Sequence, residues 1–132
     1  MEEKVKQKLV QYQQIEEQLK QFNNFFQELN EKSAEISGVI QALEDLKKTP
    51  TDKKILVPIA SGIFIQGVLK DNKEAVLTVG EGVCARKTID ETKKLLNKRL
   101  MDVEAHKAEV ARIIQQLGEV EIQLEEELEK YV

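Results

Sequence analysis

The chain has 132 residues, about the length of one domain, of which 33% are charged and 5% aromatic, which suits exposed helices better than a large globular core. The formal net charge of -4 argues against a general affinity for nucleic acid phosphates. No stretch approaches the roughly 18 apolar residues of a membrane span, no apolar signal segment opens the chain, and a lone cysteine permits no internal disulfide, so a cytoplasmic protein that contacts neither nucleic acid nor membrane is expected.

The first predicted element is a long helix over residues 1–48. One stripe of residues recurs at alternating intervals of three and four: Tyr12, Ile15, Leu19, Phe22, Phe26, Leu29, Ser33, Ile36, Ile40 and Leu43. A mean spacing of about 3.5 residues makes a narrow stripe, which becomes buried by winding around a partner helix. The helix should end near Lys48, because Pro50 disfavours helical conformation at the residue before it.

Residues 49–88 are predicted to form two consecutive β-hairpins. The period changes to two, and short turns rich in glycine, asparagine and aspartate separate four expected strands: Ile55–Ala60, Ile63–Lys70, Ala75–Val79 and Val83–Lys87. Apolar residues fall on both faces of these strands, since Phe64 and Val68 oppose Ile63, Ile65 and Leu69. Isolated hairpins are marginal in water, so we expect other subunits to cover them and to join their edges into a shared sheet or barrel.

The last predicted element is a helix over residues 89–132. Thr88 and Glu91 have the spacing of a capping box at its start. A second stripe follows: Leu96, Leu100, Val103, His106, Val110, Ile113, Leu117, Val120, Leu124 and Leu128. This stripe predicts that the second helix packs against the first.

The two stripes pair when the chain folds back on itself. Eight of the ten pairs have residue numbers that total 139 and the other two total 140, which places Ser33 opposite His106 and Phe26 opposite Ile113. The predicted fold is therefore α+β but mostly α: one domain with a long antiparallel two-helix coiled coil, joined by two β-hairpins that form an oligomeric barrel. Its predicted core comprises Leu19, Phe22, Phe26, Leu29, Val110, Ile113, Leu117 and Val120.

No residue pattern predicts an active site. His106 opposite Ser33 reads as a polar layer that fixes alignment, and a metal site would need further ligands. Cys84 lies mid-strand and is expected to be a small packed residue without an activating base. Gly80-Glu81-Gly82 is too short for a phosphate-binding loop and precedes a strand. We expect neither an enzyme nor a cofactor.

Apolar residues lie outside the regular stripes near both chain ends. The first stripe slips upstream of Tyr12, where Val5 and Leu9 follow spacings of four and three, and Val10 falls outside it. Ile122, Tyr131 and Val132 lie beside or beyond the second stripe, among several glutamates. Two interpretations stay open: frayed helix ends, or an adaptable apolar surface with an acidic rim that contacts unfolded chains.

The whole chain resembles the α-type subunits of the prefoldin family. The resemblance rests on two segments between the predicted helices. Leu56–Ile65 looks like the family's Val-Pro-hydrophobic-x-x-Gly first strand, and Val79-Gly80-Glu81-Gly82-Val83 looks like its Val-Gly-x-Gly-Val second hairpin. Two hairpins, rather than one, match the α type.

The resemblance implies a fold and a function beyond what the residue patterns establish. In this family two α-type subunits dimerise through their hairpins and recruit four β-type subunits into a double β-barrel. The far ends of the coiled coils hold unfolded proteins without ATP and pass them to a group II chaperonin. Assembly contacts would be Ile63, Ile65, Val76, Val79 and Val83. Clients would be contacted by the region that contains Val5, Leu9, Val10, Ile122, Tyr131 and Val132.

Two alternatives remain. A γ-type relative would form homo-oligomeric filaments from this chain alone, whereas an α-type subunit would need a β-type partner to form large assemblies. A plain coiled-coil scaffold would bind no client, and its terminal residues would be energetically idle.

Overall fold

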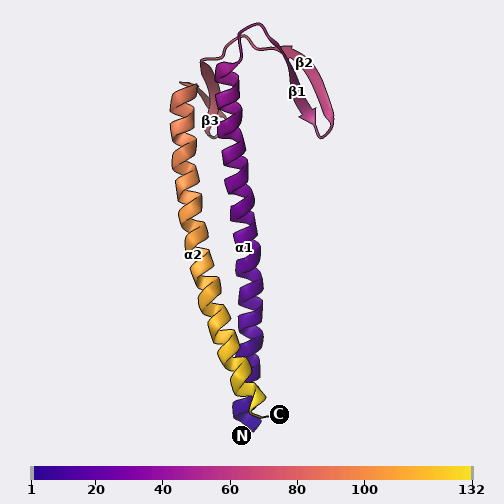
Figure 1. The fold of residues 1–132 in the computed structure, drawn as a ribbon, viewed down its shortest axis with the longest axis vertical. Helices are drawn as coiled ribbons and strands as arrows, with labels where there is room; N and C mark the ends of the chain where they lie inside the picture. The colour runs from indigo at the N-terminus through magenta and orange to yellow at the C-terminus, as the bar shows by residue number, and fades with distance from the viewer. Residues whose placement is uncertain (1, 132) are drawn as a thin grey trace. The chain divides into compact units, whose positions relative to one another are not determined.

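The computed structural model describes residues 2–131 and contains the predicted succession of helix, two hairpins and helix (Figure 1). Helix α1 spans Glu2–Lys48 and helix α2 spans Ile89–Glu129. Between them lie β1 (Lys54–Ala60), β2 (Ile63–Val68), β3 (Glu74–Gly80) and β4 (Val83–Thr88). α1 ends at Lys48, as Pro50 predicted. No helix among these described residues is long and apolar enough to cross a membrane.

The chain forms two compact units. One combines α1 up to Ala34 with α2 from Met101, and the other runs from Glu35 to Leu100 and includes both hairpins. Contacts between the two helices show that they run antiparallel within each unit. Lys8 pairs with Glu127 in the first unit, and Lys93 pairs with Glu44 in the second.

The predicted stripe of α1 is confirmed. Each of its ten residues is buried or half-buried, and Leu29, Ile36 and Leu43 are among the most buried apolar residues of the described chain. The stripe also continues without interruption toward the N-terminus through Lys8 and Val5, both half-buried. The predicted slip at Leu9 is therefore wrong, because Lys8 occupies the position that the apolar pattern assigned to Leu9.

The predicted stripe of α2 needs two corrections. His106 and Val120 are exposed, and their neighbours Lys107 and Glu121 take the half-buried positions. Val120 therefore does not belong to the core. Between two core residues that are seven positions apart, the intermediate stripe residue can lie either three or four positions after the first. The apolar pattern does not distinguish these two spacings. Lys107 fits the second choice because its ammonium lies 5.8 Å from the centroid of the Phe26 ring while its methylenes can pack along the stripe.

The predicted register of the two helices is also wrong. The Ser33 hydroxyl donates a 2.5 Å hydrogen bond to Glu104, not to His106. This bond, with Lys107 nearby, lowers the pKa of the Glu104 carboxyl. The Ser33–Glu104 hydrogen bond and the Lys8–Glu127 ion pair both indicate that α2 is shifted along its axis by about one stripe position, relative to the predicted register. We infer that Val110, rather than Ile113, lies in the layer of Phe26.

Cysteine crosslinking checks this register. Cysteines at Phe26 and Val110 are expected to form an intrachain disulfide faster than cysteines at Phe26 and Ile113. The second pair is offset by three residues, about 4.5 Å along the helix axis, which strains disulfide geometry. Both variants carry Cys84→Ser and are compared by non-reducing electrophoresis after mild oxidation. Faster closure of the Phe26/Ile113 pair would restore the register predicted from sequence.

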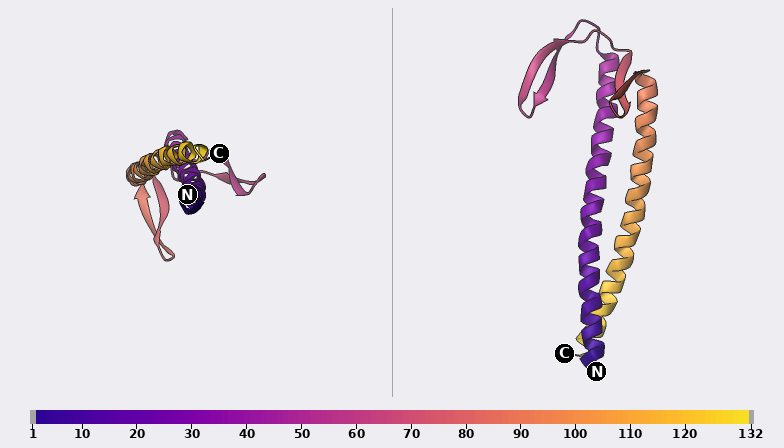
Figure 2. Two further views of the ribbon diagram at one scale, coloured as in Figure 1. Left: turned by 90° about the horizontal axis from the view of Figure 1, so that it is seen from below. Right: turned by 180° about the vertical axis from the view of Figure 1, so that it is seen from behind.

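Each hairpin turns through two residues, the second of which is glycine. Gly62 follows β1 and Gly82 follows β3, with φ values of 78° and 79° that glycine adopts without a steric penalty. Leu56 pairs with Gln66 in the first hairpin, and Val76 pairs with Arg86 in the second. The hairpins form separate two-stranded sheets (Figure 2). A closed barrel would therefore require strands from further subunits.

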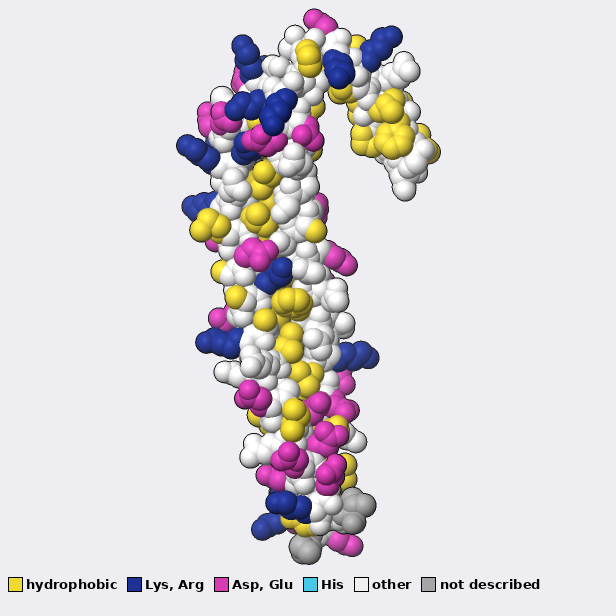
Figure 3. Space-filling view, viewed as in Figure 1, with side chains coloured by type: hydrophobic (Ala, Val, Ile, Leu, Met, Phe, Trp, Pro, Cys, Tyr) yellow, Lys and Arg dark blue, Asp and Glu magenta, His cyan; other side chains and the backbone are white. Residues whose placement is uncertain are grey.

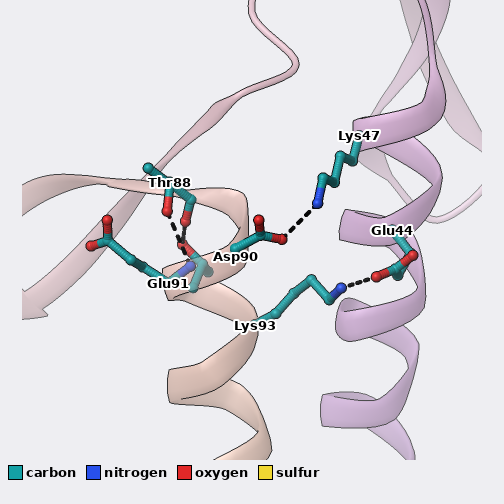
Figure 4. Close-up of polar contacts among 7 residues, drawn as sticks. Glu44, Lys47, Thr88, Asp90, Glu91 and Lys93 are labelled. Carbon is teal, nitrogen blue, oxygen red and sulfur yellow. Dashed lines mark hydrogen bonds and ion pairs between the residues drawn. The ribbon is translucent and has the colours of Figure 1, made fainter.

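Polar contacts fix the start of α2 against the end of α1 (Figure 4). The predicted cap is present, since the Glu91 amide donates to Thr88 Oγ1 at 3.1 Å. Asp90 in the first turn of α2 pairs with Lys47 in the last turn of α1 at 2.8 Å, so each charge complements its own helix dipole. Lys93 also pairs with Glu44. The start of α2 also contacts the residue before the second hairpin, because the Ile89 amide donates a 2.9 Å hydrogen bond to the Lys73 carbonyl.

Candidate interaction surfaces

The first hairpin presents a large uncharged apolar surface. No charged residue occurs from Ile55 to Leu69. Ile63 and Ile65 are exposed. Five further exposed residues were not predicted as assembly contacts: Leu56, Val57, Ile59, Phe64 and Val68. Figure 3 shows hydrophobic side chains gathered on this hairpin. The absence of charges was the sequence signal that could have identified these five residues.

The second hairpin has two different faces. Ala75, Leu77 and Ala85 are half-buried on one face, and Val76 is exposed on the other. Val79 and Val83, which flank the turn, are exposed as well. Cys84 is also exposed, so the expectation of a packed thiol is wrong. The reason is its register: Cys84 pairs with Thr78, on the face that carries Val76.

We define the large exposed apolar residues of both hairpins as the hairpin surface: Leu56, Val57, Ile59, Ile63, Phe64, Ile65, Val68, Val76, Val79 and Val83. Monomeric proteins rarely leave contiguous apolar patches uncovered, and two-stranded sheets carry unpaired backbone groups along both edges. The arrangement can therefore bind further strands and bury apolar side chains between subunits.

A second apolar surface lies where the N-terminal end of α1 meets the C-terminal end of α2. Leu9, Val10, Ile122 and Tyr131 are exposed there. Val5 is half-buried and lines a shallow hollow of about 330 Å³ together with Glu2, Lys6 and Tyr131. Val132, the remaining predicted residue, lies outside the described residues. The structure adds Val120, which was predicted to be in the core but is exposed.

We call this second set the tip surface: Val5, Leu9, Val10, Val120, Ile122 and Tyr131. Its side chains are apolar, but acidic residues surround them, as Figure 3 shows for one face. Lys8 lies among them: its ammonium is 3.0 Å from Glu127 Oε2 and 5.6 Å from the centroid of the Tyr131 ring. These contacts join the two helix ends.

Glutamate side chains act on Tyr12, the first stripe residue below the tip surface. A hydrogen bond with Glu16, reduced hydration and the charges of Glu125, Glu16 and Glu121 raise the pKa of Tyr12 to about 12. Exposed apolar side chains within a charged rim suit weak, adaptable binding of apolar segments, since the rim keeps the free surface soluble.

Comparisons with known proteins agree with this architecture. The chain matches the family described as "Prefoldin subunit" over residues 15–131. It is 34% identical to prefoldin subunit alpha of Pyrococcus horikoshii over 83% of this chain and 77% of the relative. It is 26% identical to prefoldin subunit alpha of Thermofilum pendens over 67% of this chain and 71% of the relative.

A solved structure shares the fold. The filamentous PFD of Methanocaldococcus jannaschii, determined by cryo-EM, superposes with a TM-score of 0.75 at 18% sequence identity. The similarity covers 87% of this chain and 96% of that one.

Proposed function

The chain belongs to the prefoldin family of chaperone subunits, where it is similar to archaeal α-type subunits, and from this we propose that it is an ATP-independent holdase subunit. It captures unfolded proteins on the tip surface in the cytoplasm and delivers them to a group II chaperonin. The observation that carries the proposal is the exposure of Leu9, Val10 and Ile122 at the helix ends, beside a stripe whose residues are buried or half-buried.

The hairpin surface supports the assembly part of the proposal. Its residues are exposed on both faces of the first hairpin, and each hairpin is a separate two-stranded sheet. A second copy of this chain and β-type subunits would cover these faces and complete a barrel. Residues 55–69 of the first hairpin are suited to burial, because they include no charge whose desolvation would oppose association.

The tip surface supports the client part. Unfolded chains expose apolar segments of no fixed sequence, so their binding site needs apolar contact area without shape specificity. No single tip residue is expected to dominate, because binding is spread over several exposed side chains on two helices.

Light scattering tests client capture. A chemically unfolded client is diluted into buffer with the complete chain, alone and together with a β-type prefoldin subunit. Suppression of aggregation is expected, and the triple variant Leu9→Ser/Val10→Ser/Ile122→Ser is expected to need roughly ten times more protein for the same effect. That factor corresponds to a loss of about 1.4 kcal/mol of binding free energy.

The matched control replaces exposed apolar residues elsewhere on the helices. Val39→Ser/Met101→Ser removes side chains that are also exposed, and it should suppress aggregation as well as the unmodified chain does. Equal loss in both variants would point to general hydrophobicity rather than the tip surface. No suppression by any chain, with or without the β-type subunit, would leave a scaffold without clients.

A further inference from the structure

Both helices place a charged residue in the stripe at the tip and turn the adjacent apolar residue outward. On α1, Lys8 is half-buried while Leu9 is 44% exposed. On α2, Glu121 is half-buried while Val120 is 42% exposed. This choice is unfavourable for packing alone, because a charged side chain at a stripe position lowers coiled-coil stability relative to an apolar one.

The apolar pattern itself favours the opposite choice. Val5, Leu9 and Tyr12 make a stripe with spacings of four and three, and Leu117, Val120 and Leu124 make one with spacings of three and four. Small changes in helix winding convert one phase into the other. In the alternative phase Leu9 and Val120 would enter the stripe, and the tip surface would lose both residues.

Specific contacts hold the observed phase. The Lys8 ammonium is 3.0 Å from Glu127 and 5.6 Å from the centroid of the Tyr131 ring, so one side chain on α1 contacts two on α2. Both partners of the ion pair are only partly exposed, with side-chain exposures of 28% and 36%. Rotation of α1 into the alternative phase would carry Lys8 away from these partners.

We propose that Lys8 is a positioning residue, which holds the end of α1 in the phase that presents Leu9 to unfolded segments. Its part in client capture rests on the proposed function, whereas its control of helix phase does not. Lys8 does not have to touch the client. The packing stability given up at this position maintains apolar surface at the tip.

Methyl NMR tests the phase directly in the complete chain. A soluble paramagnetic probe broadens the methyl signals of exposed leucines, and the Leu9 signals are assigned by their loss in Leu9→Met. In Lys8→Ala we expect the probe to broaden the Leu9 methyl signals less. Their broadening should fall from the level of a residue that is 44% exposed toward that of Leu124, which is 8% exposed. Glu127→Gln, which removes the partner charge, is expected to shift Leu9 in the same direction.

Two further variants separate positioning from charge. Lys8→Arg keeps the cation, and Lys8→Leu fills the stripe with an apolar side chain, so both should leave Leu9 exposed. Client suppression should fall only in Lys8→Ala and Glu127→Gln, although neither variant removes an apolar side chain. Unchanged Leu9 exposure in Lys8→Ala would overturn the proposal. Protected Leu9 without any client suppression, even by the unmodified chain, would support the phase control and reject the holdase function.

Discussion

Ile65→Asp is expected to abolish assembly through the hairpins while leaving the helices folded. Ile65 is 50% exposed in the single chain and pairs with Val57 within the uncharged segment 55–69 of the first hairpin. In an assembly that buries this face, the new carboxylate would lose its hydration without gaining a partner, which costs several kcal/mol per ion. A loss of about 3 kcal/mol weakens association by more than 100-fold. Light scattering coupled to size-exclusion chromatography measures the native mass, with and without a β-type subunit.

The matched control for this variant is Ser61→Asp. It adds the same charge to the same hairpin, but at the exposed turn between β1 and β2. The native mass of this variant should equal that of the unmodified chain. Circular dichroism should show equal helix content in all three proteins, because the hairpins lie outside α1 and α2. An unchanged mass for Ile65→Asp would rule out the first hairpin as an assembly contact.

Leu29→Ala is expected to lower the free energy of unfolding by about 3 kcal/mol, within the range of roughly 2–5 kcal/mol typical of buried leucines. Leu29 is 8% exposed and lies in the stripe of α1, next to the layer that contains Ser33. Its truncation removes buried methyl groups and leaves a cavity between the helices. Urea unfolding followed by far-UV circular dichroism gives the change, provided that the slope of the transition is unchanged.

Phe25→Ala is the control for the core variant. Phe25 is a larger apolar residue on the same helix, but it is 45% exposed and lies outside the stripe. Its replacement should change the unfolding free energy by no more than about 0.5 kcal/mol. If Phe25→Ala were the more destabilising of the two, the stripe would not be the surface that joins the helices.

The sequence predicted the features that depend on local chemistry. Pro50 ends α1, glycines at positions 62 and 82 permit the two tight turns, and Thr88 caps α2. Each of these depends on residues within a few positions of one another, so no tertiary information was needed. The stripe of α1 was predictable for a similar reason, since its alternation of three and four is unbroken from Tyr12 to Leu43.

The tip surface was predicted in part. Val10, Ile122 and Tyr131 lie outside both stripes in the sequence and are exposed in the structure. Val120 was missed because an apolar residue three positions after Leu117 satisfies the stripe as well as one four positions after it. The same ambiguity concealed the stripe position of Lys8, since Leu9 beside it was the better apolar candidate.

Composition, turn chemistry and apolar periodicity were thus sufficient to specify two long helices and two hairpins. The predicted strand ends agree with the structure to within one residue, except that β2 ends at Val68 rather than at the predicted Lys70. The phase of α2 and the register between the helices required the tertiary structure. A periodic stripe tolerates a shift of one position, and only the facing side chains select among the alternatives. Here the selection is visible in the hydrogen bond from Ser33 to Glu104, and in the placement of Lys107 over Phe26 and of Lys8 against Glu127.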